Sequence, residues 1–414
     1  MAWVNWSRKL PVETNQGSSA LGIEFTASRA RAATGKSSRN RPLLLDDPHP
    51  DLPLSISLEK RSLEVGRPAI LLVRKLPHLT CGSYLPFLGQ RREWKGGRHC
   101  LDASIALSLI FDKLRVSCTS FENIVAGLPS YLTPSQVSKF CTLAAKSRFP
   151  LKGTASSSLA LVADRVAALL TPELMEAEKR EEGIVPLHRP GKLHLPADAI
   201  LVDVDEHALT ASLIRIEPNQ VRLISTTTLP RLNVKFWKDR LLDSLSHRCV
   251  HICRRDPRDS ADAEQGLYDQ IDDNLDRIRF GQMVTLTVRG DHWYQDLHVQ
   301  PEEWERYCTN LIRQSVEGIR ELMIAGSAVE PPRAVWMTHE AGRLPGLAQA
   351  LHQNMAERTS VGVLRPESVA IALANLGERW LAGELPYTHL DSAIPIVTTI
   401  PESKTQTPTV KTHR

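Results

Sequence analysis

The sequence predicts an α/β protein built from two related lobes that face each other across a cleft. Strand-like runs are followed by helix-like runs twice along the chain, first after about residue 19 and again after about residue 198. A polar stretch rich in Pro and Glu, about residues 176–195, separates the two series. Residues 121–147 also show a complete strand, turn and helix, which is the repeating unit of an α/β layer. Two such lobes make the space between them the first place to look for a ligand.

Composition is consistent with this globular fold. Of the 414 residues, 42% are hydrophobic and 24% are charged, which is enough apolar material for two domain-sized cores. No run approaches the roughly 18 consecutive apolar residues of a membrane helix, and residues 1–19 lack the apolar core of a signal peptide. The 7 cysteines are scattered rather than arranged as a disulfide framework. We therefore expect a cytoplasmic protein with free thiols and no membrane partner.

The same patterns give domain boundaries. We expect a disordered lead-in at residues 1–18, lobe I at 19–175, a linker at 176–197, lobe II at 198–395 and a disordered tail at 396–414. An α+β subdomain is expected as an insertion in lobe II at about residues 230–330.

In lobe I, the runs at residues 19–25 and 29–35 predict a pair of strands, and residues 41–47 and 52–59 predict further short strands. A helix is expected from about Cys100 to Arg115 because its apolar residues form a broad face.

The clearest local signal in lobe I is a helix start at Thr133. The Thr133 hydroxyl is suited to cap the helix, Pro134 fits the first helical position, and Gln136 lies where a capping box has its second member. The apolar face that follows consists of Val137, Phe140, Cys141 and Ala144. This face should pack against the strand that precedes the turn.

Lobe II repeats the pattern, with strands expected at residues 199–205, 208–216 and 221–227. The elements expected after them are a helix at about Val234 to Leu245, a charged helix at Ala261 to Arg279, a β-pair at 284–299, a helix at Glu302 to Ile324, a strand at Ala334 to His339, a helix at Leu344 to Gln353, a strand at 359–364 and a closing helix from Pro366 to about Ala382.

Two local features were weighed as nucleic-acid or metal sites. The formal net charge is only +4, and the richest basic stretch, Arg91, Arg92, Lys95 and Arg98 around Trp94, is better explained as a solvated loop. His247, Cys249, His251 and Cys253 offer four potential zinc ligands. On a helix, however, the His pair and the Cys pair would lie on different faces, and the spacing matches no closed zinc module. We expect neither nucleic acid nor zinc to bind.

Read in order, these segments resemble the ATPase domain of the DnaK-type seventy-kilodalton heat-shock chaperones, a branch of the actin and sugar-kinase superfamily. The similarity runs from about Ala20 to Gly383. LGIEFTAS is similar to the family's first phosphate loop, LPSYLTPSQ to its VPAYF segment, VDVDEHALTASLI to its second phosphate loop, FWKDRLLDSL to the helix after that loop, MTHEAGRLPGL to its adenosine loop, and RPESVAIALANL to its closing helix. The resemblance implies an actin-like fold with two ribonuclease-H-like lobes, and it implies ATP and Mg²⁺ as ligands.

The residues at the implied phosphate positions differ from those of the family. In the first loop Gly22 and the hydroxyl of Ser28 are retained and Glu24 stands at the acidic position, but Thr26 and Ala27 replace the next residues of the family's Gly-Thr-Thr.

In the second loop Asp203 matches the acidic position, which makes it the one weak candidate for a metal ligand. Asp205, Glu206 and His207 replace the family's three glycines. Side chains, two of them acidic, would then stand where bare backbone should meet an anionic phosphate.

Other implied site positions also carry changed residues. His339 and Glu340 replace the paired glycines of the adenosine loop. The family's catalytic lysine falls at about Leu85 and its glutamate at about Thr154, while Arg343 matches the adenine-stacking arginine. The Lys and Arg of the inserted helix fall near Leu275 and Asp276.

Structural roles are an alternative at each retained position. Asp203 can cap a turn, Arg343 can pair with a surface carboxylate, and Glu24 can be a solvent-facing strand residue. The remnant nucleotide site is therefore Gly22, Glu24, Ser28, Asp203 and Arg343, with no catalytic residue assigned.

These changes favour a pseudo-ATPase that acts as a protein-interaction or regulatory module with a protein partner. The main alternative is an ATP-binding or ATP-hydrolysing chaperone relative with a rearranged site. A sugar or small-molecule kinase needs the same glycine-rich loops and is disfavoured. Residues after Ala382 are too few for a peptide-binding domain, so we do not expect peptide capture of the usual kind.

Overall fold

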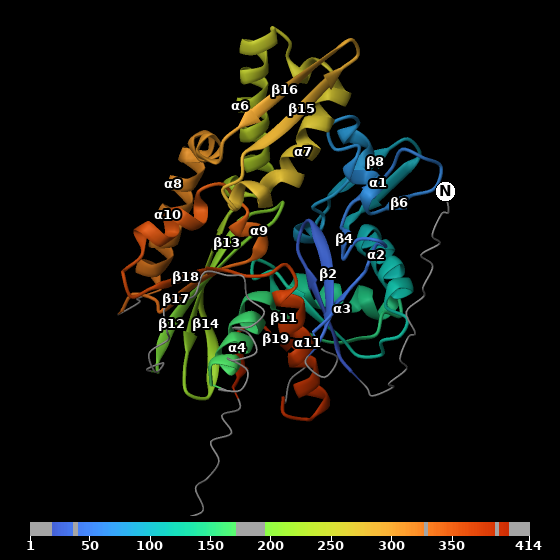
Figure 1. Cartoon of the computed structure of the whole chain (residues 1–414). Coiled ribbons are helices and arrows are strands. Elements are labelled where there is room, and N and C mark those ends of the chain that lie inside the picture. The colour runs from blue at the N-terminus through green and yellow to red at the C-terminus, as the bar shows by residue number, and fades with distance from the viewer. Residues whose placement is uncertain (1–18, 36–39, 171–194, 327–329, 386–388, 397–414) are drawn as a thin grey trace, which may run out of the picture.

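Two large β-sheets stand side by side in a mixed α/β arrangement (Figure 1). The computed structural model describes residues 19–35, 40–170, 195–326, 330–385 and 389–396. The first sheet has the strand order β19-β11-β10-β1-β2-β3, with β4 also paired to β2. The second sheet has the order β18-β17-β12-β13-β14-β20.

The strands of the two sheets have these bounds: β1 Leu21–Phe25, β2 Arg29–Thr34, β3 Pro42–Leu43, β4 Asp51–Pro53, β10 Ile124–Leu128, β11 Leu151–Ser156 and β19 His389–Leu390 in the first, and β12 Ala197–Val204, β13 Leu209–Ile216, β14 Gln220–Leu229, β17 Ala334–Met337, β18 Ser360–Val363 and β20 Ala393–Pro395 in the second. Smaller sheets contain β5 Ile56–Ser57, β6 Glu64–Val65 and β7 Thr80–Cys81, then β8 Glu93–Gly96 and β9 His99–Asp102, and finally β15 Val284–Gly290 and β16 Trp293–Val299.

The α-helices are α1 Arg67–Ile70, α2 Ala103–Ser117, α3 Pro134–Lys146, α4 Ser157–Leu170, α6 Val234–Cys253, α7 Ala261–Arg279, α8 Pro301–Ala325, α9 His339–Gly342, α10 Leu347–Asn354 and α11 Ser368–Leu381. Short 3-10 turns lie at Pro77–Leu79, Leu85–Phe87, Pro230–Leu232 and Pro257–Asp259.

The two sheets repeat one topology. In the first, β1 pairs antiparallel with β2 and parallel with β10, and β10 continues parallel to β11. In the second, β12 pairs antiparallel with β13 and parallel with β17, and β17 continues parallel to β18. Strand β3 pairs with β2, and β14 pairs with β13, so each antiparallel hairpin gains a third strand at the corresponding edge. Each sheet therefore has three antiparallel strands beside two parallel ones. We call the parts of the molecule built on the first and second sheets the first half and the second half.

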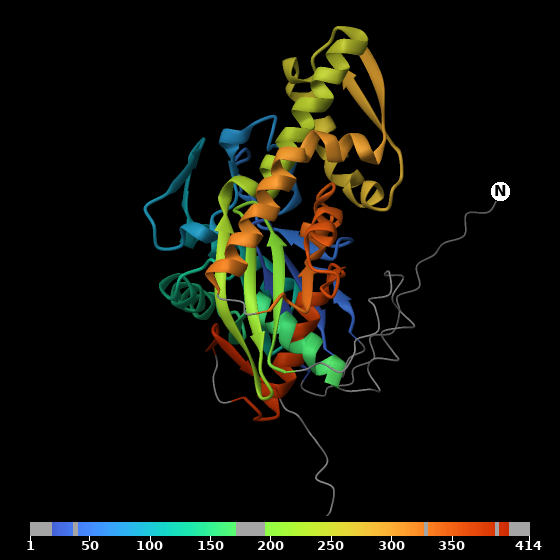
Figure 2. The same cartoon turned by 90° about the vertical axis from the view of Figure 1, so that its left-hand side faces the viewer.

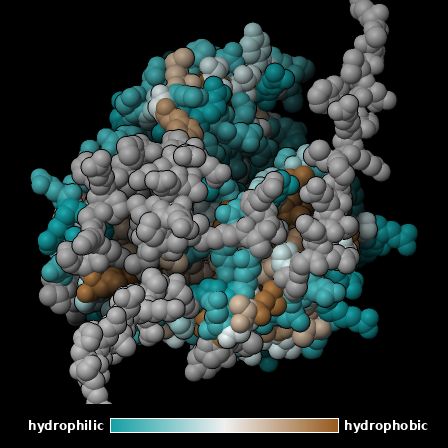
Figure 3. All heavy atoms as spheres, turned by 60° about the horizontal axis from the view of Figure 1, so that its bottom comes forward, coloured by the Kyte–Doolittle hydropathy of each residue, from teal (hydrophilic) through white to brown (hydrophobic). Residues whose placement is uncertain are grey.

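Helices α4 and α11 join the two halves (Figure 1). They pack against each other, α11 also contacts β1 and β10, and α4 also contacts β14 and β20. The hydrophobic cluster around them takes residues from both sheets, for example Val125 and Ala155 from the first and Leu201 and Ile214 from the second. Figure 3 views the molecule from below, and there hydrophobic residues lie in small separate areas among hydrophilic ones.

Helices α6 and α7 and the β15–β16 hairpin stand above the second sheet as a separate layer (Figure 2). Helix α7 lies against β15, and its buried residues join the same hydrophobic cluster as β12 and β13. Helix α8 contacts α6 and runs down along β13 and β14. The top of the second half therefore rests on the sheet through a continuous apolar core.

The predicted helix start at Thr133 is confirmed. The Thr133 hydroxyl accepts a hydrogen bond from the Gln136 N–H at 3.3 Å, and the Gln136 side chain accepts one from the Thr133 N–H at 2.9 Å. Pro134 is the first residue of α3, where its missing N–H costs nothing. The Gln136 amide also donates to the Pro86 carbonyl at 2.6 Å, which holds the 85–87 turn against this helix.

Other predicted elements need correction at their ends. The helix expected from Cys100 begins at Ala103, because Cys100 lies in β9 and the Asp102 side chain caps the helix. The helix expected to end at Leu245 continues to Cys253. The strand expected to reach His339 ends at Met337, because Thr338 caps the short helix α9. Helix α7 spans the predicted range, Ala261–Arg279.

Several predictions fall partly or wholly outside the described residues. These are the lead-in at 1–18, residues 171–194 with most of the linker, and the tail from 397. Among the described helices, none is both long and apolar enough to span a bilayer.

Candidate interlobe site

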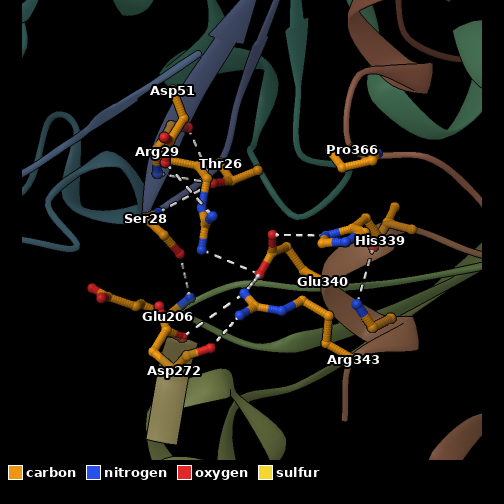
Figure 4. Close-up of polar contacts among 12 residues, drawn as sticks. Thr26, Ser28, Arg29, Asp51, Glu206, Asp272, His339, Glu340, Arg343 and Pro366 are labelled. Atoms are coloured by element: carbon orange, nitrogen blue, oxygen red, sulfur yellow. Dashed lines mark hydrogen bonds and ion pairs between the residues drawn. The ribbon is translucent and has the colours of Figure 1, made fainter. Parts of the chain in front are cut away.

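Charged side chains from both halves meet in one buried group between the sheets, which we call the Glu340 cluster: Glu340, Arg29, Arg31 and Arg343. Arg29 and Arg31 donate to Glu340 from β2 at 3.1 and 2.8 Å. Arg343, directly after α9, donates to it at 3.2 Å. In Figure 4 the Arg29 guanidinium lies to the left of the Glu340 carboxylate and that of Arg343 lies below it, and both donate to the same oxygen. Glu340 is only 8% exposed, so these contacts are shielded from water.

Glu340 is held in its charged form by its neighbours. Burial alone would raise the pKa of this carboxyl, but Arg29, the His339 side chain, Arg343 and Arg31 together lower it well below its usual range. His339 in turn has a raised pKa, because its hydrogen bonds to Asp276 and Glu340 outweigh the effect of burial.

A second ring of carboxylates surrounds the arginines. Asp276 lies 3.2 Å from Arg343 Nε and 3.0 Å from His339 Nε2. Asp272 lies 3.8 Å from Arg343 and 3.4 Å from Lys238 Nζ, whose pKa is lowered by burial. On the other side, Asp51 lies 3.6 Å from Arg29. The alternative that Arg343 pairs with surface carboxylates holds for Asp272 and Asp276, whose side chains are 40% and 39% exposed, while Arg343 itself is buried and also binds the buried Glu340.

The two loops that resemble phosphate loops contact each other directly. An Asp205 carboxylate oxygen accepts hydrogen bonds from the Ala27 N–H at 2.8 Å and from the Tyr131 hydroxyl at 2.6 Å. The Glu206 N–H donates to the Ser28 hydroxyl at 3.0 Å, and the Glu206 carboxylate accepts from the Ser83 hydroxyl at 2.7 Å. The Asp205 side chain thus binds the backbone of the first loop, and the Glu206 backbone binds the Ser28 hydroxyl of that loop.

Glu24 and Asp203 form an acidic layer beneath these contacts. Glu24 lies on β1 and is 6% exposed, so the alternative that it faces solvent is wrong. Asp203 lies near the end of β12 and accepts a hydrogen bond from the Thr338 hydroxyl at 2.7 Å, a partner in a different strand's loop rather than in its own turn.

Both acids are easier to protonate than usual. Burial, followed by the charges of Glu24 and Asp205, raises the pKa of Asp203 to about 8. Burial also raises the pKa of Glu24 to about 7, although Arg31 acts in the opposite direction. Near neutral pH this layer therefore carries less negative charge than its two carboxyl groups suggest.

Gly22 has a packing role. It lies on β1, and a Cβ at this position would come within 2.0 Å of the Ala370 carbonyl oxygen and 2.5 Å of the Ala374 nitrogen in α11. Only glycine permits this approach between the strand and the helix. The retained glycine is thus explained by the contact with α11.

The positions matched to the family's lysine and glutamate lie in other surroundings. Leu85 is fully buried in the core of the first half, beside residues such as Tyr84 and Leu88. Thr154 lies on β11, where its hydroxyl is 2.9 Å from His389 Nδ1. Neither residue contacts the Glu340 cluster. Leu275 is also a core residue, whereas Asp276 belongs to the carboxylate ring described above.

The structure separates the candidate zinc ligands on α6. Cys249 is buried, its Sγ lies 3.6 Å from that of Cys253, and burial raises its pKa to about 12. His247 and His251 are exposed on another face of the helix. Throughout the part of the chain that the structure describes, no three His, Cys, Asp or Glu side chains are grouped so that they could hold a metal ion.

Sequence reasoning missed the residues that supply most of the positive charge. Arg29, Arg31 and Lys238 were not singled out, and neither was Tyr131 as a partner of Asp205. One signal was present, since Arg29 and Arg31 are two apart in a strand and must lie on the same face. The sequence does not reveal that this face meets Glu340, more than 300 residues later.

No protein-family model matches this chain, and no curated protein matches it.

Proposed function

We propose that the chain has the DnaK-like, actin-like ATPase fold and acts as a pseudo-ATPase, a protein-interaction or regulatory module that does not use ATP. The repeated topology of the two sheets supports the fold, because each half places a three-stranded antiparallel meander beside two parallel strands. Fold alone does not decide activity, so the functional proposal depends on the residues between the halves.

The observation that carries the functional proposal is the contact between the two loops. A nucleotide site of this type needs backbone N–H groups free to approach phosphate. Here the Ala27 N–H already donates to the Asp205 carboxylate at 2.8 Å, and Asp205 is 3% exposed. An incoming triphosphate would have to displace a bound carboxylate and then tolerate its negative charge.

The arginines do not offset this repulsion. Arg29, Arg31 and Arg343 are the cations of the Glu340 cluster, and Glu340 already accepts a hydrogen bond from each. The alternative of ATP hydrolysis with a rearranged site is therefore less well supported.

The outward side of α8 is a candidate docking surface for the partner. The outward side of α8 carries charged residues along its length, including Glu302, Arg306, Arg313 and Arg320. In the other charged helix, α7, Asp272 and Asp276 are already paired with Arg343. We therefore favour α8 as the docking surface.

Titration with Mg-ATP tests the proposal. We expect no saturable rise in Tm and no binding heat, because a ligand that binds only the native state must raise its Tm. We also expect no phosphate release above background. An affinity in the micromolar range would contradict the proposal. ATP hydrolysis would also contradict the proposal if Asp203→Ala abolished it and Asp262→Asn did not. Asp262 is the control because its side chain is 75% exposed.

A further inference from the structure

The contacts around Glu340 have the form of an anion-binding site. Three guanidinium groups converge on one carboxylate: Arg31 reaches Oε1 at 2.8 Å, and Arg29 and Arg343 reach Oε2 at 3.1 and 3.2 Å. The side chains of these arginines are 8–19% exposed. Arginine is the residue best suited to planar recognition of carboxylate and phosphate oxygens, and its contacts are strongest where water is excluded.

The arginines do not depend on Glu340 alone for their positions. Arg343 Nε lies 3.2 Å from Asp276, and Arg29 lies 3.6 Å from Asp51. Arg31 also donates to the Pro366 carbonyl at 3.4 Å. Each guanidinium therefore has a second anchor that would remain if the Glu340 side chain were removed.

We propose that Arg29, Arg31 and Arg343 form a binding site for a phosphate-sized oxyanion and that the Glu340 carboxylate is its built-in occupant. The inference rests on the proposed function, since it identifies what fills the cleft in place of a nucleotide. The inference adds that the three arginines can still bind an anion and that the Glu340 side chain blocks this site.

The surroundings select a small anion over a nucleotide. Asp51, Asp272 and Asp276 face the arginines from the outside, and Glu24 lies on the strand next to Arg31. A single phosphate can take the place of the Glu340 carboxylate within this ring. A triphosphate would extend into the outer carboxylates and be repelled by them. The ligand class is therefore inorganic phosphate or a terminal phosphoryl group.

The test is the dependence of Tm on inorganic phosphate, with ionic strength held constant by chloride. Wild-type protein should show no saturable change, because Glu340 occupies the site. Glu340→Ala should have a lower Tm in chloride and a saturable rise with phosphate, roughly 3–5 °C at a concentration of about 100 times Kd. In the double variant Glu340→Ala with Arg31→Ala, this saturable rise should disappear.

Glu303→Ala is the matched control. Glu303 also pairs with two arginines, Arg248 at 2.8 Å and Arg306 at 3.5 Å, but Arg306 is 69% exposed. This variant should give only the general, non-saturating effect of phosphate on protein surfaces. The proposal is overturned if folded Glu340→Ala behaves like Glu303→Ala, or if the double variant keeps the saturable rise.

Glu340→Ala may also be tested through folding itself, because removal of one member of a buried ion pair is strongly destabilising. If the variant does not fold in chloride, recovery of folded protein in phosphate supports the site. Failure in both salts overturns it, because a phosphate that replaced the carboxylate must stabilise the folded state. These outcomes use variants and inorganic phosphate, so they are independent of whether wild-type protein binds Mg-ATP.

Discussion

Two buried carboxyl groups between the two halves have pKa values that are shifted in opposite directions. Asp203 has a pKa raised from 3.8 to about 8, so the folded state keeps a proton that the unfolded chain loses. Its contribution to stability is therefore full at low pH and declines as pH rises from about 4 to 8. Glu340 has a lowered pKa, so its contribution is present above the usual value of 4.5 and is lost as pH falls below it. Stability should peak near the acidic side of neutrality.

Replacement of Asp203 by Asn tests the first of these effects. Asn keeps an oxygen that can accept the Thr338 hydrogen bond but cannot ionise. Between pH 5 and 8, the unfolding free energy of Asp203→Asn should fall less steeply than that of wild type, by about 1 kcal/mol per pH unit. Urea unfolding at several pH values measures this slope. Asp262→Asn, at an exposed carboxylate, should retain the wild-type slope, and an unchanged slope in Asp203→Asn would refute the assignment.

The residue types of this site were visible in the sequence, but their environments were not. The acidic residues at positions 205 and 206 were expected to interfere with phosphate on grounds of charge and bulk. In the structure the Asp205 side chain accepts a hydrogen bond from the first loop, whereas the Glu206 side chain binds Ser83 and only the Glu206 N–H contacts Ser28. The burial of Glu24 could not be predicted from the sequence. Glu24 lies two positions from another polar residue, and this spacing is compatible with either the buried or the solvent-exposed face of a strand. Burial depends on what covers β1, which here is the opposite half.

Individual helices and strands show where local chemistry is sufficient for prediction. The start of α3 was predicted to the residue, since Thr133, Pro134 and Gln136 act on their own backbone neighbours. The ends of α6 and β17 were not: α6 continues to Cys253, and β17 ends at Met337 because Thr338 caps α9. Helix α6 continues beyond Leu245, where Arg248 binds Glu303 and the His298 carbonyl in the insertion. The buried residues Leu241, Leu245 and Cys249 also continue one apolar face of the helix past the expected end.

The cap of α3 gives a prediction about one element. Thr133→Ala removes the hydroxyl that accepts from the Gln136 N–H, and it should lower the unfolding free energy by about 1 kcal/mol. Thr133→Ser keeps the hydroxyl and should remain close to wild type. Chemical denaturation of the two variants makes the comparison. If Ser were as destabilising as Ala, packing of the Thr methyl group would be the cause and the cap would not.

At the scale of the whole molecule, a second group of hydrogen bonds and ion pairs connects the two halves, and we call this group the latch. We define this latch by five residues: Ile70 at the end of α1, Arg74 after it, Asp239 of α6, and Glu264 and Gln265 of α7. The Gln265 side chain accepts from the Arg74 N–H at 2.7 Å and donates to the Ile70 carbonyl at 3.3 Å. The Arg74 guanidinium pairs with Asp239 and Glu264 and lies over the Tyr268 ring at 4.3 Å. The Glu340 cluster and the latch hold the halves together at two levels.

No sequence pattern predicts this latch, and residues 70–74 lie in none of the elements expected from the sequence. Periodicity identifies the buried face of α7, on which Gln265 lies beside Leu267 and Tyr268. It does not identify the backbone that a buried amide will bind. That partner comes from nearly 200 residues earlier in the chain, in a segment with no recognisable motif.

The latch predicts how the two halves open. Gln265→Ala removes the acceptor of the Arg74 N–H, so hydrogen exchange at the Arg74 amide should become about tenfold faster, as expected for the loss of one buried hydrogen bond. Peptides that cover residues 70–76 should exchange faster as a group, while those from the β1 and β12 strands should not. Asn274→Ala is the control, because Asn274 lies on the same helix and bonds within it. Equal protection of the Arg74 amide in wild type and Gln265→Ala would mean that the ion pairs of Arg74 hold the halves together without the glutamine.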